Sequence, residues 1–263
     1  MRREGRPFHL REWREACRIQ VDVESKSRRH RSMNWTDTTL VMLPGLDGTA
    51  DLFEPALRLD WGGMRAAAIP LPANGPQDYE SLARRLSSAL PDGELVLLAE
   101  SFSTPLAMLL ASRLGDRVKA LALVAGFCAN PQASGLGWLP LRPLFAVSPP
   151  AFFLRQFLTG ESPPAALLAA LTQVIGRVPS AILAERVRVA LALREADCPG
   201  VGKVPLLLLQ AQQDRVIPWA AQSQLERHFP DATCVWVNGP HLLLQTRTQE
   251  CRNAVIRFLS GIG

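Results

Sequence analysis

The stretch Leu95-Val96-Leu97-Leu98-Ala99-Glu100-Ser101-Phe102-Ser103 decides the fold of this chain. Its apolar first half predicts a buried strand, and the following residues 104–111 predict a helix. A serine on the sharp turn between such a strand and helix stands clear of its neighbours, with the free N–H groups of the helix start behind it. Ser101 is therefore the candidate nucleophile. The small residues Ala99 and Ser103 allow the two backbones to pass close together.

An ordinary turn with a serine at the helix start fits the same sequence. The interpretation as a nucleophile therefore requires catalytic partners elsewhere in the chain. A serine nucleophile needs a base, a group that orients the base, and donors for the oxyanion. Residues 206–210 predict a buried strand, and Asp214 lies in the loop after it. Residues 234–237 predict another strand, and His241 follows it on a Gly-Pro turn. Because reactive groups gather at the carboxyl edge of a parallel sheet, we expect both side chains to meet Ser101.

An early strand supplies a candidate for the oxyanion site. Residues 40–43 are apolar and end in Pro44-Gly45-Leu46-Asp47-Gly48-Thr49. Glycine lets a backbone N–H approach a developing negative charge closely. We expect the backbone N–H groups of Leu46 and Phe102 to be the two donors, although a plain Pro-Gly turn is the alternative for the first of them.

These segments together resemble the α/β-hydrolase fold family, over residues from about 38 to the C-terminus. The resemblance implies a nucleophile at Ser101, an acid at Asp214 and a base at His241. The sequence departs from the family pattern at three positions. Pro44 stands where many members carry histidine, which matters little because the donor is a backbone group. Ala99 and Ser103 stand where they carry glycine.

Strands alternate with helical stretches along the chain, and the strands are apolar almost throughout. This pattern indicates an α/β fold with a mostly parallel sheet covered by helices on both faces. After the strand that ends near Val124 the alternation stops, and helix-like pieces occupy a segment of about 127–200. We expect this segment to be a helical cap over the catalytic edge, inserted into a hydrolase domain of residues 33–263. Its apolar residues favour an apolar acyl or alkyl substrate group; they are Trp138, Leu139, Leu141, Leu144, Phe145, Phe152, Phe153 and Phe157.

The formal net charge of +5 comes from the first 32 residues, which contain ten Lys/Arg and five Asp/Glu; the rest of the chain is neutral. Residues 1–32 are interpreted as a basic extension, disordered in one reading, with Met33 beginning the functional protein. The alternation of residues 19–24 leaves an edge strand open as another interpretation. Arginines interspersed with glutamates, without aromatic residues to stack on bases, argue against nucleic-acid binding. No apolar run is long enough for a membrane span, and the charged start does not resemble a secretory signal.

The five cysteines are Cys17, Cys128, Cys198, Cys234 and Cys251. Their odd number and scattered spacing argue against a disulfide framework and a zinc site, and favour a reducing cytoplasm. We expect neither a metal nor a cofactor. His228 is interpreted as a charge near the end of a surface helix, where a cation suits the helix dipole.

The expected function is a serine hydrolase that acts on a carboxylic ester or thioester with an apolar group, through an acyl-enzyme on Ser101. Two alternatives remain open at this level. One is an acyltransferase that uses the same three side chains, and the other is a non-catalytic protein of the same fold that binds a small apolar ligand.

Overall fold

The computed structural model describes residues 35–131, 145, 149–161 and 163–262. Within this part of the chain, six strands form one sheet in the order β2-β1-β3-β4-β5-β6, and each pairing is parallel. The expected fold class is confirmed. The strands are β1 (Thr38–Leu43), β2 (Arg65–Ala68), β3 (Glu94–Glu100), β4 (Val118–Val124), β5 (Leu206–Ala211) and β6 (Thr233–Val237).

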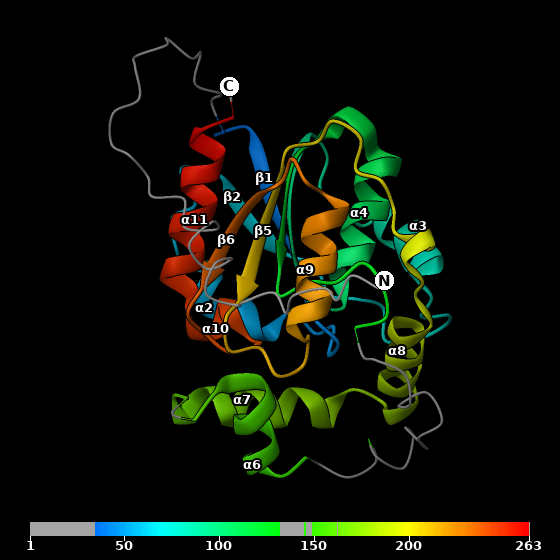
Figure 1. Ribbon diagram of the computed structural model, residues 1–263, viewed down its shortest axis with the longest axis vertical. Coiled ribbons are helices and arrows are strands. Elements are labelled where there is room, and N and C mark those ends of the chain that lie inside the picture. The colour runs from blue at the N-terminus through cyan, green and yellow to red at the C-terminus, as the bar shows by residue number, and fades with distance from the viewer. Residues whose placement is uncertain (1–34, 132–144, 146–148, 162, 263) are drawn as a thin grey trace, which may run out of the picture. The chain divides into compact units, whose positions relative to one another are not determined.

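Helical elements occupy the connections between these strands, and α10 and α11 follow the last strand (Figure 1). The α-helices are α2 (Glu54–Leu57), α3 (Tyr79–Ser87), α4 (Ser103–Leu114), α6 (Ala151–Leu154), α7 (Ala165–Arg177), α8 (Ser180–Ala192), α9 (Trp219–His228), α10 (Leu243–Thr246) and α11 (Thr248–Ser260). Shorter turns are the 3-10 helices η1 (Asp51–Phe53), η2 (Gly115–Arg117) and η5 (Glu195–Asp197), and the π-helix η4 (Arg155–Thr159).

The sheet is buried on both faces because neighbouring residues of each strand point to opposite sides. In β1, Val41 and Leu43 pack with α3, α4 and α9 on one face. Leu40 and Met42 pack with α2, α10 and α11 on the other face. Strands that are buried on both sides need apolar residues at every position, which explains why residues 95–98 and 206–209 show no polar alternation.

The connection from β4 to β5 contains α6, η4, α7, α8 and η5. We call residues 127–200 the cap segment, of which the structure describes the parts given above. Leu154, Leu171 and Val174 of this segment pack with Leu52 and Leu242, so α6 and α7 rest on η1 and on the turn after His241. Phe152 and Phe153 are exposed to solvent. Trp138, Leu139, Leu141 and Leu144 lie outside the described residues.

Residues 1–32, including the expected extension and the alternating stretch 19–24, also lie outside the described residues. Among those that the structure describes, no single helix is long and apolar enough to cross a membrane. Only α7 and α8 taken together reach that length and apolar character, and the chain bends by 97° between them.

Candidate active site

Ser101 occupies a strained turn between β3 and α4. Its backbone φ is 51°, in the left-handed region that residues other than glycine rarely adopt. The backbone N–H of Ser101 still donates to the carbonyl of Val124 at 2.9 Å, so the turn begins as an extension of the sheet. Thr104 then donates its hydroxyl to the Ser101 carbonyl at 2.8 Å. These bonds hold the serine in the strained conformation, which raises its hydroxyl at the carboxyl edge of the sheet.

The structure brings Ser101, His241 and Asp214 together in one chain of contacts. Nε2 of His241 lies 2.9 Å from Oγ of Ser101, and Nδ1 lies 2.8 Å from Oδ2 of Asp214. Because a carboxylate only accepts hydrogen bonds, Nδ1 carries the ring proton and Nε2 is left to accept from the serine hydroxyl. The side chain of Asp214 is fully buried and that of His241 is 4% exposed, so water competes little for these bonds.

The loop after β5 holds the Asp214 carboxylate in position. Oδ1 accepts from the backbone N–H groups of Val216 and Ile217, each at 2.8 Å. Oδ2 is therefore free to face the imidazole. A carboxylate with both oxygens engaged has little freedom to rotate, so it sets the orientation of the histidine ring.

Two buried carboxyl groups act on the imidazole. Burial alone lowers the pKa of His241, but the charge and hydrogen bond of Asp214, together with the charge of Glu100, outweigh it and raise the pKa above 6.5. Burial raises the pKa of Glu100 itself to about 7, against the lowering effect of its hydrogen bond from Gln245. That bond measures 3.0 Å and reaches Oε2; Oε1 has no partner among the described residues.

The loop after β1 lies directly against Ser101. A Cβ added to Gly45 would stand 3.7 Å from Cβ of Ser101. The hydroxyl of Ser103 donates to the carbonyl of Pro44 at 2.5 Å and so joins the two loops. Leu46 follows Gly45 in this loop, and Phe102 follows Ser101, where its ring stacks on Tyr79 with the centroids 5.1 Å apart. Both expected oxyanion donors thus belong to segments that meet at Ser101.

Arg186, which the sequence did not single out, reaches from α8 into the same loop. This arginine is completely buried. Its Nη1 donates to the carbonyls of Leu46 and Asp47 at 2.9 and 2.8 Å, and its Nη2 donates to the carbonyl of Pro72 at 3.1 Å. Burial lowers the pKa of Arg186 to about 10, although the negative charge of Asp47 opposes this shift. A side chain at Gly48, where φ is 71°, would collide with the guanidinium.

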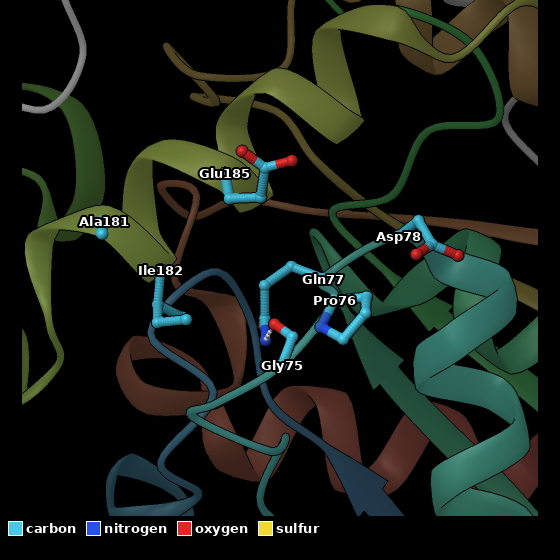
Figure 2. A pocket seen from close by; sticks show the side chains of 7 residues that line it. All are labelled: Gly75, Pro76, Gln77, Asp78, Ala181, Ile182 and Glu185. Carbon is cyan, nitrogen blue, oxygen red and sulfur yellow. Dashed lines mark hydrogen bonds between the residues drawn. The ribbon is translucent and has the colours of Figure 1, made fainter.

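Gln77 fixes the remaining edge of this arginine. Its Oε1 accepts from Nε of Arg186 at 2.9 Å, while its Nε2 donates to the Gly75 carbonyl at 3.0 Å. Figure 2 shows this glutamine under α8, beside Ile182 and Glu185. These residues border a cavity of about 320 Å³. Ser101, Asp214 and His241 are not among its seven lining residues.

The cap segment contacts the loops that carry Asp214 and His241. The backbone N–H of Leu242 donates to the carbonyl of Leu158 in η4 at 3.0 Å. Nη1 of Arg215, next to Asp214, donates to the carbonyl of Gln156 at 3.4 Å. The position of η4 is therefore coupled to both Asp214 and His241.

No protein-family model and no curated protein matches this sequence. Solved structures do resemble the chain in three dimensions. An esterase from Exiguobacterium antarcticum gives a TM-score of 0.72 at 16% identity, covering 85% of this chain and 92% of its own. An enol-lactonase from Burkholderia xenovorans gives 0.70 at 18% identity, covering 88% and 94%. A type II thioesterase from the borrelidin biosynthetic cluster gives 0.59 at 19% identity, covering 88% and 95%.

At these identities the likeness establishes the fold: this chain has the α/β-hydrolase fold. The resemblance noted in the sequence is therefore confirmed at the level of the fold. What Ser101, Asp214, His241, Leu46 and Phe102 do is a separate question.

Proposed function

We propose that this protein is a serine hydrolase of carboxylic esters or thioesters with an apolar acyl or alkyl group. The observation that carries the proposal is the contact chain from Oγ of Ser101 through His241 to the buried Asp214, at 2.9 and 2.8 Å. Three side chains distant in sequence rarely meet in this order without nucleophilic chemistry. The esterase, lactonase and thioesterase with the same fold support the same reaction class.

The first half of the proposed reaction forms an acyl-enzyme. Oγ of Ser101 attacks the acyl carbon as its proton passes to Nε2 of His241. Asp214 stabilises the imidazolium that results, and the N–H groups of Leu46 and Phe102 stabilise the oxyanion. The imidazolium then gives its proton to the departing alcohol or thiol, and the bond from the acyl carbon to that group breaks.

The second half releases the acid. A water molecule attacks the acyl carbon while His241 takes one of its protons. The proton returns to Oγ of Ser101 as the ester bond to the enzyme breaks. Water must therefore reach the acyl-enzyme, and an acceptor alcohol or amine would compete for it if the protein were an acyltransferase.

Charge and the cap segment favour a neutral substrate with an apolar group. Within the described residues, α6 and η4 present Phe152, Phe153 and Phe157 at the cap segment, and the rings of the last two lie 4.6 Å apart. The cation nearest the proposed oxyanion loop, Arg186, already donates to four protein oxygens and is not free for a phosphate. A neutral ester with an apolar substituent fits this setting. The four cysteines among the described residues are all free thiols, which supports a reducing, cytoplasmic location within the same proposal.

Labelling with a fluorophosphonate probe tests the role of Ser101. We expect the wild-type protein to be labelled on Ser101 and Ser101→Ala to be unlabelled and properly folded. Turnover of a chromogenic ester should fall by roughly 10⁴–10⁶ in that variant. Ser112→Ala, an exposed position on α4, is the matched control and should behave as wild type.

A chain-length series of esters and matched thioesters then defines the substrate, and added alcohols or amines measure partition of the acyl group. Equal labelling or turnover in Ser101→Ala would disprove the assignment. A wild-type protein that binds the apolar esters but is never labelled would be the non-catalytic ligand-binding alternative.

A further inference from the structure

Three side chains outside the proposed active site converge at one point. Sγ of Cys128, Sγ of Cys198 and a ring nitrogen of His228 all lie within 4.8 Å of one another. They come from three separate places: Cys128 follows β4, Cys198 directly follows η5, and His228 is the last residue of α9. We call these residues the thiol–imidazole cluster.

The surroundings of the cluster are rich in sulfur. Sγ of Cys198 donates to Sδ of the buried Met108 at 4.0 Å. The carboxylate of Glu195 lies near enough to act on both thiols, so it adds negative charge beside the cluster.

We propose that Cys128, Cys198 and His228 bind a thiophilic d¹⁰ cation, Zn²⁺ or Cu⁺. Two thiolates and an imidazole are ligands that both ions accept. Ligand atoms at about 2.0–2.3 Å from a shared ion lie about 3–4 Å from one another, so the cluster needs to contract by only about 1 Å. Water supplies the fourth ligand of Zn²⁺, whereas the thioether of Met108 suits Cu⁺.

Binding is a deprotonation and involves no electron transfer. The S–H bonds of Cys128 and Cys198 break as two metal–sulfur bonds form, and two protons leave to solvent. Neutral His228 donates the lone pair of one ring nitrogen. Cys128 is 1% exposed, but Cys198 and His228 are partly exposed, so an ion can enter from their side.

The place of the cluster in the fold gives the ion a structural consequence. Cys128 and Cys198 lie near the two ends of the cap segment, and His228 belongs to a helix that packs on the sheet. The same two ends already meet through a hydrogen bond of 2.8 Å from the Asn130 N–H to the Leu193 carbonyl. A cation bound by all three residues would connect both ends of the cap segment to α9.

Metal binding to the reduced full-length protein tests the proposal directly. The protein is stripped with a chelator, and Zn²⁺ is titrated against a chromophoric chelator; Cu⁺ is titrated likewise without oxygen. We expect one equivalent bound per chain. Cys128→Ser, Cys198→Ser and His228→Gln should each weaken binding by at least about tenfold. Cys234→Ser, a partly exposed thiol on β6, is the matched control and should bind as wild type.

Two further measurements distinguish the ions and guard against misfolded variants. Met108→Leu should weaken Cu⁺ binding and leave Zn²⁺ binding unchanged. In wild type, the bound ion should protect the partly exposed Cys198 from alkylation but not Cys234. Failure of reduced wild type to take up either ion would overturn the proposal, as would binding that survives all three ligand substitutions. A Cys128–Cys198 disulfide in a protein that takes up no ion after reduction would show a redox pair instead.

Discussion

The hydroxyl of Ser103 donates a hydrogen bond of 2.5 Å to the backbone carbonyl of Pro44, and Ser103 is completely buried. This bond ties the turn that carries Ser101 to the loop that carries Leu46. Glycine, which the α/β-hydrolase pattern carries at this position, could not form it. The departure from the pattern therefore adds a link between the two segments that the proposed oxyanion site requires.

Replacing Ser103 by alanine should weaken both the fold and the reaction. The Pro44 carbonyl loses its buried partner, so the free energy of unfolding should fall by about 1–3 kcal/mol. The loop with Leu46 also loses a restraint, and kcat for ester hydrolysis should fall roughly tenfold with KM nearly unchanged. Urea denaturation and steady-state kinetics measure the two effects, with Ser112→Ala on the same helix as the control. A wild-type kcat in Ser103→Ala would show that this link does not position the site.

Arg186 should matter through the loop that it holds. Arg186→Met leaves the carbonyls of Leu46, Asp47 and Pro72 without their donor in a buried region, so we expect a loss of about 3–5 kcal/mol in stability. Arg186→Lys keeps a charge but not the planar set of donors, and should fold with a reduced kcat. Thermal unfolding and kinetics of both variants test this.

Arg188→Lys is the control for that pair. Arg188 is an exposed residue of α8 whose ion pair with Glu185 is worth little, so its replacement should change neither quantity. Full activity and stability in Arg186→Lys would mean that the loop after β1 keeps its conformation without the hydrogen bonds of the guanidinium group.

Glu100 should control the pH dependence of the reaction. His241 must be neutral to accept the serine proton, so kcat/KM should fall as pH drops through its raised pKa. The negative charge of Glu100 contributes to that rise. Glu100→Gln should therefore move the acid limb of the pH profile of kcat/KM to lower pH. Glu250→Gln, an exposed position on α11, should leave the profile in place. An acid limb that stays still, or moves to higher pH, would contradict this coupling.

The same substitution should stabilise the fold at high pH. Burial raises the pKa of Glu100 from 4.5 to about 7, so the folded state disfavours its ionised form. The wild type is free of this cost below pH 4.5 and loses stability as pH rises toward about 7. The full cost is on the order of 3 kcal/mol. Urea denaturation at about pH 5 and about pH 8 should show Glu100→Gln gaining much more on wild type at the higher value.

Much of the fold was predictable because its signals are local. The apolar runs at 40–43, 95–98, 118–124 and 206–210 all lie within strands of the observed sheet. The helix-like pieces expected within about 127–200 include α7 and α8. The predicted meeting of Ser101 with Asp214 and His241 also followed from strand ends, because parallel strands bring those ends to one edge.

Other features gave no local signal. Arg186 lies in α8 among arginines and glutamates that face solvent, and only the packing of α8 against the loop after β1 makes it a buried donor. Glu100 lies in the stretch that predicts the turn, but its burial beside Gln245 depends on how α10 packs against the sheet. Cysteine spacing argued against a metal site, yet Cys128, Cys198 and His228 come together from three separate elements.

The amino-acid sequence by itself determined the strands, the turns and the positions of Ser101, Asp214 and His241 at strand ends, since each depends on neighbours a few positions away. Only the tertiary structure decided which distant groups come together. The guanidinium of Arg186 donates to the carbonyl of Leu46, the carboxyl of Glu100 lies near His241, and the thiols of Cys128 and Cys198 lie beside the imidazole of His228. Contacts of this kind arise from the packing of helices against the sheet, and no short stretch of the chain encodes them.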